Sequence, residues 1–394
     1  MSAWKMCRIG DLCDTISETY KRTDNMVVLI NTSDVLEGEV LNHTPVPNEN
    51  LKGQFKKTFQ RDDILYSEIR PANKRFAFID FEDTSKYIAS TKLMVLRPRK
   101  AVVLPLFLYA ILKSRDVLEE LQHLAETRSG TFPQITFSSE LAPMEIMLPD
   151  FTTQKQIVGI LSAIEDKIRL NTAINENLLQ QALCIYASLI EDKPKNGCIG
   201  DYCALKSGFA FKSKWWQNSG VPVVKIGSIN QDYLNLADCS YVSEDKVALA
   251  KDFIVSGGDL LIAMTGATIG KFTMVPKATK TILVNQRVGK FFLGDNPINR
   301  VPFIYSTLKQ PDIITDIINR GQGSAQPNIS ASDILSIPCV IPQQTEINVF
   351  NEQTTPMFEL IINNQYENQR LAVLRDKLLP KLMNGEIDVS AVQI

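Results

Sequence analysis

Residues 152–191 read TTQKQIVGILSAIEDKIRLNTAINENLLQQALCIYASLIE. Apolar side chains and two asparagines recur in alternating steps of four and three residues, which is the heptad spacing of a helix that packs along a partner helix. The predicted seam contains Ile157, Leu161, Ile164, Ile168, Asn171, Asn175 and Leu178. We expect a helix of about 40 residues, roughly 60 Å long. Pro194 and Gly197 end it.

A second stretch with the same spacing runs from about Gln344 to Met383. Its predicted seam contains Ile361, Asn364, Asn368, Leu371 and Leu378. Arg375 interrupts this seam, and Pro356 either kinks the helix or starts its main segment. Gly385 is expected to cap its C-terminal end.

Each of the two seams carries a central pair of asparagines. One alternative is that each pair faces water at a bend of its helix. The other is that the two helices pack antiparallel and the pairs meet at mid-length, where buried asparagine fixes register at a cost in stability. This second alternative predicts two globular units at opposite ends of a rigid rod, related by a pseudo-two-fold axis.

The rest of the chain repeats itself with a period of about 190 residues. The repeated segments occur in the same order in both halves. They are IGDLC (9–13) and IGDYC (199–203), RDDILY (61–66) and GGDLLI (257–262), FLYAILK (107–113) and FIYSTLK (303–309), GTFPQITFSSEL (130–141) and GSAQPNISASDIL (323–335), and MLP (147–149) and VIP (340–342). The order indicates a tandem duplication.

Each copy begins with short β-rich runs between turn signals and continues with a helix, over 104–126 in the first copy and 301–320 in the second. We therefore expect a mixed α/β (α+β) fold of two pseudo-symmetric domains separated by two long antiparallel coiled-coil helices. The predicted divisions are a first globular domain at 1–150, a central long helix at 151–195, a second globular domain at 196–342, and a C-terminal long helix with a tail at 343–394.

The composition is that of a soluble globular protein, with 44% hydrophobic and 22% charged residues. The formal net charge is −2, so an acidic partner must be bound by local basic patches. The N-terminal segment lacks the apolar core of a signal peptide. The longest apolar run, 101–112, is too short to span a membrane and is expected to be a buried helix opened by Pro105. We expect a cytoplasmic protein with no membrane contact.

Cysteine and histidine usage argues against a metal site. The chain has seven cysteines, without a CxxC pair, and its only histidines, His43 and His123, lie far from them in sequence. Buried free thiols in a reducing compartment are the expected state. No metal ligand is predicted.

The sequence also lacks recognisable catalytic motifs. GATIGKF (266–272) has three residues between its glycines where a phosphate-binding loop needs four, and Phe272 stands where that loop needs a hydroxyl. A tight turn between strands is the better interpretation, although the corresponding RPANKRF (70–76) has no glycine. Few side chains suited to general acid–base catalysis are present. We expect no catalytic residue and no enzyme activity from this chain alone.

Basic residues cluster in loops among asparagine, glutamine and serine. They are either solvated surface or groups that contact phosphates and base edges. The candidate DNA-binding residues are Lys56, Lys57, Arg70, Lys74, Arg75, Arg128, Lys212, Lys214, Trp215, Lys271, Arg287 and Arg320. Thr136 and Ser330 are expected to cap the short helix after each repeated motif, and Asp333 to complete a capping box.

The order of these motifs resembles the specificity subunits of type I restriction–modification systems. The residues that carry the resemblance are IGDYCALKSGFAFKSKWW (199–216), VPVVKIGSIN (221–230), GDLLIAMTGATIGK (258–271), GSAQPNIS (323–330), IPQQTEINVFNEQ (341–353), LPDFTTQKQIVGILSAIEDKI (148–168) and LRDKLLPKLMNGEIDV (374–389). The first copy departs from the pattern at RPANKRF and at VVLINTSDVLEGEV (27–40).

The resemblance implies two target recognition domains that each bind one half of a split, asymmetric site on double-stranded DNA, with the helices setting the gap. It also implies two methyltransferase subunits and translocating restriction subunits as partners. S-adenosylmethionine, ATP and magnesium would belong to those partners, and this chain would hold no cofactor. Inserting four residues after Asn171 should lengthen the helix by about 6 Å and shift the gap between half-sites.

Two other functions fit the same residues. The chain could be a non-catalytic protein-binding scaffold, with two globular domains on a coiled-coil rod. It could also be a DNA-modifying enzyme with a cryptic site. Selection of a bipartite DNA sequence distinguishes the first alternative, and methyl transfer by the chain alone distinguishes the second.

Overall fold

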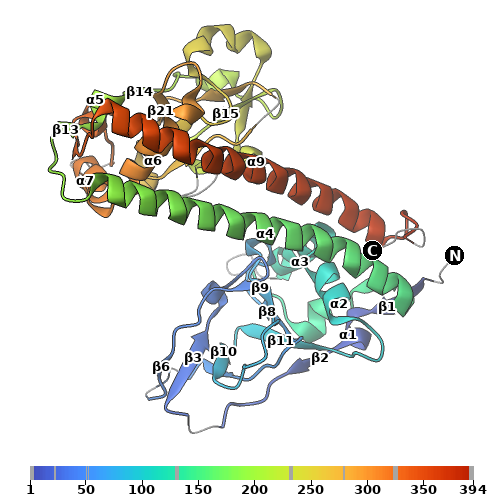
Figure 1. Cartoon of the computed structure of the whole chain (residues 1–394). Helices are drawn as coiled ribbons and strands as arrows, with labels where there is room; N and C mark the ends of the chain where they lie inside the picture. Colours follow the sequence, from blue (N-terminus) through green and yellow to red (C-terminus); the bar gives the residue numbers. More distant parts are fainter. Residues whose placement is uncertain are drawn as a thin grey trace. The chain divides into compact units, whose positions relative to one another are not determined.

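The computed structural model describes residues 4–21, 24–49, 51, 53–128, 133–229, 234–277, 280–322 and 327–389. The chain divides into two compact units (Figure 1). Unit 1 comprises Met1–Asp166 and Ala372–Ile394, and unit 2 comprises Lys167–Leu371. Each unit therefore combines a globular part with segments of two long helices.

Unit 1 is built on two larger sheets, with strand orders β6–β3–β10–β7 and β2–β11–β8–β9. Strand β1 pairs with β12, and β4 with β5. The strands are β1 (Lys5–Arg8), β2 (Cys13–Ile16), β3 (Met26–Ile30), β4 (Val35–Leu36), β5 (Glu39–Val40), β6 (Val46–Pro47), β7 (Phe55–Lys57), β8 (Ile64–Ser67), β9 (Phe76–Phe78), β10 (Tyr87–Ser90), β11 (Leu93–Pro98) and β12 (Glu145–Leu148). The shorter helices are α1 (Ile9–Leu12), α2 (Pro105–Leu112) and α3 (Arg115–Arg128).

Unit 2 repeats the two four-stranded sheets and the β1–β12 pair of unit 1, whereas the described residues of unit 2 form no counterpart of the β4–β5 pair. Its sheets have the orders β16–β15–β20–β17, β14–β21–β18–β19 and β13–β22. The strands are β13 (Gly197–Cys198), β14 (Ala204–Ser207), β15 (Val221–Val224), β16 (Ser240–Val242), β17 (Ile254–Val255), β18 (Leu260–Ala263), β19 (Phe272–Met274), β20 (Ile282–Val284), β21 (Val288–Phe292) and β22 (Pro338–Cys339). The shorter helices are α5 (Ile199–Tyr202), α6 (Val301–Leu308), α7 (Pro311–Gly321) and α8 (Ala331–Leu335). The predicted duplication and mixed α/β class are confirmed.

Among the described strands, each unit contains one parallel pair, and the other strand pairs are antiparallel. β3 pairs with β10 in unit 1, and β15 with β20 in unit 2. A connection between parallel strands must cross over, so sequence-distant segments are brought together at the carboxyl ends of each pair. These ends carry the polar residues described below.

The repeated IGD segments pack in the same way in both units. Gly10 of α1 packs against Ala142, which directly follows the repeated motif at 130–141. Gly200 of α5 packs against Leu335, the last residue of the second copy of that motif. A Cβ atom at Gly10 would lie 3.0 Å from the Cβ of Ala142, and one at Gly200 would lie 3.2 Å from the carbonyl oxygen of Leu335. The close backbone approach explains why both copies have glycine there.

The RDDILY and GGDLLI segments also form the same turn. The carboxylates of Asp63 and Asp259 each accept a hydrogen bond from the backbone N–H three residues earlier, at 2.9 and 2.8 Å. Both side chains are almost fully buried and each pairs with a cation on the neighbouring strand, Arg97 in unit 1 and Lys290 in unit 2. The pairs satisfy carboxylates that would otherwise be costly to bury.

The helical region of each copy differs from the expected single helix. It consists of two helices, α2 and α3 in unit 1 and α6 and α7 in unit 2. In unit 2 the break falls at Pro311, which occupies the first turn of α7 and cannot continue α6. In unit 1 the Ser114 hydroxyl accepts from the N–H of Val117 and starts α3. The expected buried helix at 101–112 is confirmed, because α2 begins at Pro105 and Phe107–Leu112 are buried.

The two long helices are α4 (Phe151–Ile190) and α9 (Gln344–Met383), each within a residue of its predicted span. The Asp150 carboxylate accepts the N–H of Thr153 at 2.9 Å and caps α4. α9 continues on both sides of Pro356, so this proline does not start the helix. Gly385 has φ +69° after the end of α9, as expected for a C-terminal cap.

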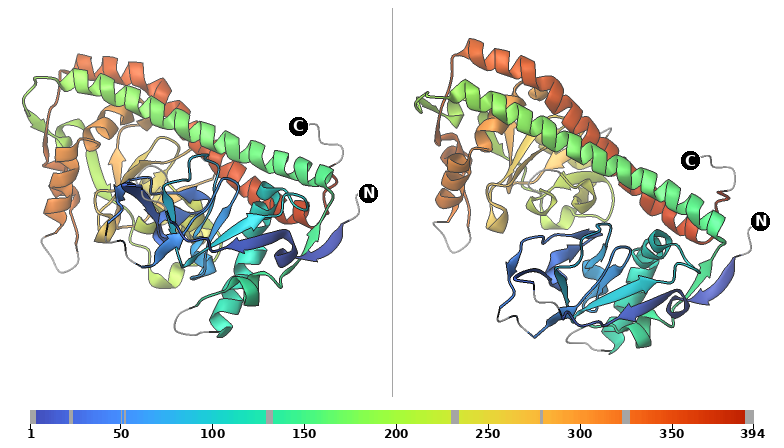
Figure 2. Two further views of the ribbon diagram at one scale, coloured as in Figure 1. Left: turned by 90° about the horizontal axis from the view of Figure 1, so that it is seen from below. Right: turned by 60° about the horizontal axis from the view of Figure 1, so that its bottom comes forward.

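In unit 2, α4 and α9 lie side by side and run in opposite directions (Figures 1 and 2). Asn171 Nδ2 donates to Asn368 Oδ1 at 2.9 Å and to Glu367 Oε2 at 2.7 Å. Asn364 Nδ2 donates to Asn175 Oδ1 at 2.8 Å. Asn171 is 1% exposed. The asparagine pairs therefore meet in the seam, and the alternative in which they face water is wrong.

In unit 1, the segments of α4 and α9 also pack together. The apolar cluster of this unit includes Ile157 and Leu161 of α4 with Leu379 and Leu382 of α9, while Leu378 packs at its edge. Arg375, which interrupts the predicted seam, lies 3.9 Å from the Glu165 carboxylate. The remaining predicted seam residues, Ile164, Ile168, Leu178 and Leu371, are half-buried, and Ile361 is 4% exposed.

All seven cysteines are free thiols, and four of them are buried. In the part of the chain that the structure describes, no three His, Cys, Asp or Glu side chains gather as metal ligands would. None of the described helices combines the length and apolarity needed to cross a bilayer.

Candidate nucleic-acid interface

The tripeptides PQI (133–135) and PNI (327–329) of the repeated motif each pair with a loop of their own unit. In unit 1 this loop, 68–75, follows the fully buried strand β8. The N–H of Ile135 donates to the Glu68 carbonyl at 2.9 Å, and the N–H of Arg70 donates to the Pro133 carbonyl at 3.1 Å. The motif thus adds a short antiparallel pairing to the base of the loop.

Unit 2 contains the same pairing at loop 264–271, after the buried strand β18. The N–H of Ile329 donates to the Met264 carbonyl at 3.0 Å, and the N–H of Gly266 donates to the Pro327 carbonyl at 2.9 Å. The first residues of both motif copies, 130–132 and 323–326, lie outside the described residues. The described residues of each motif copy therefore connect the loop to the rest of its own unit.

The expected caps after the motif are present. Thr136 Oγ1 accepts the N–H of Ser139 at 3.3 Å, and Ser330 Oγ accepts the N–H of Asp333 at 3.1 Å. Asp333 completes the capping box by accepting the N–H of Ser330. In unit 1 the same role falls to Glu140, whose carboxylate accepts the N–H of Thr136 at 2.6 Å. The turn there is the π-helical segment η3 (Phe137–Leu141), one residue wider than an α-helical turn.

The two arginines that flank the motif bind to it. Arg128 Nη1 lies 2.7 Å from Glu140 Oε1, and Arg320 Nη1 donates to the Asp333 carbonyl at 3.0 Å and to Ser336 Oγ at 2.7 Å. Both guanidinium groups therefore hold the segment after the motif in place. Their contact with DNA stays a prediction.

The two loops have the same backbone but different residues. Gly266 and Gly270 have φ of +71° and +82° in unit 2, and the equivalent Arg70 and Lys74 have φ of +45° and +52° in unit 1. A left-handed backbone costs a residue other than glycine about 1–2 kcal/mol. The tight turn predicted for GATIGKF is confirmed, and the equivalent loop of unit 1 forms the same turn with two exposed cationic residues at strained positions.

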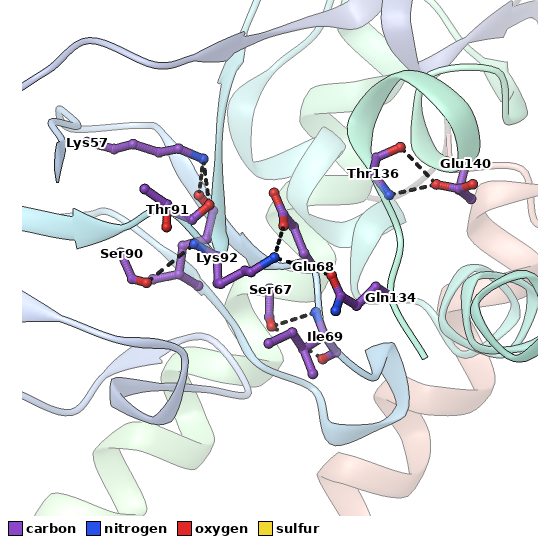
Figure 3. A network of polar contacts seen from close by, with 11 residues as sticks. Lys57, Ser67, Glu68, Ile69, Ser90, Thr91, Lys92, Gln134, Thr136 and Glu140 are labelled. Carbon is purple, nitrogen blue, oxygen red and sulfur yellow. Dashed lines mark hydrogen bonds and ion pairs between the residues drawn. The ribbon is translucent and has the colours of Figure 1, made fainter. Parts of the chain in front are cut away.

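Beside this loop, unit 1 has a polar cluster at the carboxyl end of β10 (Figure 3). The Lys92 ammonium lies 3.6 Å from the Glu68 carboxylate and donates to Gln134 Oε1 at 3.3 Å. Lys57 donates to the carbonyls of Thr91 and Leu93 at 3.1 and 2.8 Å. Burial lowers the pKa of Lys57. Its ammonium therefore supports the strand connection rather than extending into solvent.

Unit 2 places Asn285, Gln286 and Arg287 where unit 1 has Ser90, Thr91 and Lys92. The match is made by backbone hydrogen bonds: the N–H of Glu68 donates to the Lys92 carbonyl, and the N–H of Met264 to the Arg287 carbonyl, both at 3.0 Å. The side chains of the first residues, Ser90 and Asn285, accept the N–H of the third residue at 3.3 and 3.4 Å. The two connections thus have equivalent backbones and different side chains.

The connection in unit 2 borders an open cavity of about 290 Å³. Besides Gln286 and Arg287, the cavity is lined by Phe211, Trp216 and Lys225. Lys225 follows β15 directly, so the carboxyl ends of both parallel strands, β15 and β20, contribute to the cavity. The Lys225 ammonium lies 3.6 Å from the centre of the Trp216 ring, a cation–π contact, and burial lowers its pKa.

A second set of cationic side chains lies around the ring of Trp215. Lys212 and Lys246 lie 5.5 and 5.1 Å from the centre of its ring. Lys246 is also ion-paired with Asp245. Lys214 in the same segment is exposed. The predicted Lys212, Lys214 and Trp215 thus share one surface segment.

The remaining predicted residues are dispersed. Lys56 is exposed on β7, and Lys271 is half-buried before β19. Lys74 pairs with Glu37 at 2.9 Å. Arg75 Nη1 donates to the carbonyls of Ser33 and Val35 at 3.0 and 3.3 Å. Arg75 therefore braces a neighbouring loop of unit 1.

Sequence reasoning missed the residues that the strand connections bring together. Lys92, Gln134, Lys225 and Gln286 were not among the candidates. Only Lys225 and Gln286 had a local signal, because each ends a β-rich run at a polar residue in the segments VPVVKIG (221–227) and TILVNQR (281–287). Their proximity arises from the parallel pairing of β15 and β20, which no local pattern encodes.

The chain is a tandem-duplicated protein of mixed α and β structure. Its two units have the same sheets and paired long helices, but they carry different side chains at equivalent loops. A family model described as the type I restriction modification DNA specificity domain matches residues 1–180 and 191–374, one match for each copy. The chain belongs to this family of specificity subunits.

Known relatives agree with this assignment. The HindI type I restriction enzyme specificity subunit of Haemophilus influenzae is 30% identical over 476 residues, covering 98% of this chain and 100% of the relative. The MjaIX specificity subunit of Methanocaldococcus jannaschii is 26% identical over 72% of this chain and 69% of the relative. The crystal structure of the S subunit from M. genitalium has the same fold, with a TM-score of 0.55 at 17% identity, over 97% of this chain and 96% of that one.

Proposed function

We propose that this chain selects the DNA sequence for a type I restriction–modification complex, with each unit binding one half of a split, asymmetric site. The observation that carries the proposal is the equivalence of the two strand connections. Ser90–Lys92 and Asn285–Arg287 share a backbone but differ in every side chain. Duplicated units of this kind are suited to hold different half-sites in a common geometry.

Electrostatics favours local contacts over global attraction. The formal net charge is −2, so the chain as a whole does not attract DNA. The exposed cations at Arg70 and Lys74 in unit 1, and at Lys212 and Lys214 in unit 2, lie on loops and support phosphate contacts. Binding should therefore weaken with salt, in proportion to the number of phosphates contacted.

The long helices are proposed to set the gap between half-sites. In this proposal residues 1–150 and 196–342 are the recognition domains, and residues 151–195 and 343–394 are the spacer segments. The asparagine contacts between α4 and α9 support this role, because polar contacts inside an apolar seam fix the register of two helices. A spacer must keep one register if it is to define one gap.

Partner subunits are proposed to supply the chemistry. Two methyltransferase subunits would bring S-adenosylmethionine, restriction subunits would bring ATP and magnesium, and the whole complex would act in the cytoplasm. Val349 and Leu360 on α9 support a docking role for this helix, because they are 62% and 43% exposed. They are eleven residues apart and so share one face.

The test is a mobility shift with the chain and its methyltransferase partner, using a random DNA pool at moderate salt. We expect enrichment of one bipartite sequence. Failure to enrich any such sequence would refute the proposal and favour a protein-binding scaffold. The purified chain with S-adenosylmethionine alone should transfer no methyl group. Transfer by the chain alone would instead establish an enzyme.

A further inference from the structure

The cavity of unit 2 presents a guanidinium and a carboxamide with no partners of their own. Among the residues that the structure describes, neither the Arg287 guanidinium nor the Gln286 amide makes a hydrogen bond, and both residues are exposed. Their backbone is fixed, because Arg287 N donates to Asn285 Oδ1 at 3.4 Å and Gln286 N to the Phe209 carbonyl at 3.0 Å. A rigid connection thus carries two adjacent side chains with unused donors.

These side chains match the edges of bases. Arginine presents two parallel donors to O6 and N7 of guanine, and glutamine pairs with base edges by donating and accepting at once. Lys225 is a different kind of group. Its ammonium is held over the Trp216 ring, and a lysine acts on phosphate as a point charge rather than as a bidentate fork.

We propose that this cavity is the base-contact site of unit 2, in which Arg287 contacts a guanine of the half-site, Gln286 contacts the neighbouring base, and Lys225 binds the adjacent phosphate. The inference rests on the proposed function and assigns its specificity to named residues.

Unit 1 uses the equivalent position differently. Lys92 replaces Arg287, and its ammonium is already bound to Glu68 and Gln134. Asn31 stands where unit 2 has Lys225, since each directly follows the strand that pairs in parallel and precedes a short helical turn. This position lacks the free guanidinium of unit 2. The guanine contact is therefore specific to the half-site of unit 2.

The experiment compares variants of the full chain in complex with the methyltransferase partner, by selection from a DNA pool and by binding across a range of salt concentrations. Arg287→Ala should lose about 10-fold to 100-fold discrimination at one G·C pair of one half-site and leave the other half-site unchanged. Arg287→Lys keeps the charge and removes the fork. It should lose part of this discrimination with an unchanged salt slope, because lysine can still donate to guanine but not through a planar fork.

Lys225→Ala should weaken all sequences alike and reduce the salt slope by about one unit. Lys251→Ala is the matched control, because Lys251 is exposed in the same unit and does not line the cavity. It should bind as the parent does. Circular dichroism verifies that each variant is folded.

The outcomes separate the two ideas. If the parent chain enriches a bipartite site and folded Arg287→Ala keeps both half-sites, the cavity proposal is overturned while the proposed function stands. If the parent enriches no bipartite site, the proposed function itself fails.

Discussion

At the scale of single residues, the most informative difference between the two units is that Lys74 adopts a left-handed backbone at a position where unit 2 has glycine. Its counterpart Gly270 adopts the same conformation, and there a Cβ would meet only ordinary contacts at 3.5 Å or more. The same loop forms in unit 2 with glycine at this position, so the strain at Lys74 comes from placing a side chain there. Strain of this kind persists where the side chain is needed for function.

Lys74→Gly should raise the free energy of unfolding by about 0.5–1 kcal/mol. Relief of roughly 1–2 kcal/mol of backbone strain outweighs the added freedom of glycine in the unfolded chain, about 0.4–1 kcal/mol. The exposed ion pair with Glu37 contributes little. Urea denaturation measures the change, and the reverse substitution in unit 2, Gly270→Ala, should lose about 0.5–1 kcal/mol because the same two terms act in the opposite direction. A destabilised Lys74→Gly would contradict the strain argument.

The cysteines give a second prediction at this scale. Burial raises the pKa of Cys13 and of Cys203 to about 12. The thiolate is the reactive form and appears only as the pH approaches the pKa, so both thiols should be inert in the folded protein at pH 8. The exposed Cys184 should react quickly with a thiol reagent under the same conditions. Labelling followed by peptide mapping, with and without denaturant, tests this. Fast native labelling of Cys13 would contradict the prediction.

At the scale of elements, local patterns predicted what local interactions determine. The heptads placed α4 and α9 within a residue of their observed bounds, and the hydroxyls of Thr136 and Ser330 predicted both caps. The hydrogen bonds of PQI and PNI to the loops could not be predicted from local sequence patterns. They depend on backbone pairing between segments about 60 residues apart, such as Ile135 with Glu68. Backbone groups pair without regard to side-chain type, so no sequence signal marks the partner.

The asparagine seam gives a prediction that separates single from paired changes. Asn364→Leu leaves the Oδ1 of Asn175 without its 2.8 Å donor inside the helix pair. It should cost about 1–3 kcal/mol. The double variant Asn175→Leu/Asn364→Leu removes both polar groups and should be close to neutral or stabilising. Thermal unfolding of the three proteins measures the difference. Equal losses for the single and the double variant would show that the contact is not coupled.

At the scale of the whole molecule, the duplication and the family were predictable because five repeated segments kept their order. The base-contact candidates were only partly predictable. Arg287 was found as one of many basic loop residues, whereas Lys225 becomes a neighbour of Trp216 only through the folding of unit 2. Charge clusters in the sequence therefore do not show which cations already have a partner within the protein. Several of their members, including Arg75 and Arg128, bind within their own unit.

The spacer role of the helices gives the last prediction, and the structure changes how it is best tested. An insertion after Asn171 in α4 alone would separate Asn171 from Asn175, so their contacts with Asn368 and Asn364 could not both be kept. Matched insertions of seven residues after Asp166 in α4 and after Leu371 in α9 keep the heptad register of both helices. Each adds about 10.5 Å.

If the helices set the distance between half-sites, the gap in the selected DNA should widen by about three base pairs at 3.4 Å each. Both half-sites should keep their sequences, because the insertions lie outside the loops and strand connections that are proposed to contact bases. Selection with the methyltransferase complex measures the gap directly. A seven-residue insertion in α4 alone is the control, and it should destabilise the chain because α9 keeps its length. A doubly lengthened, folded chain that selects the original gap would show that another element fixes the spacing.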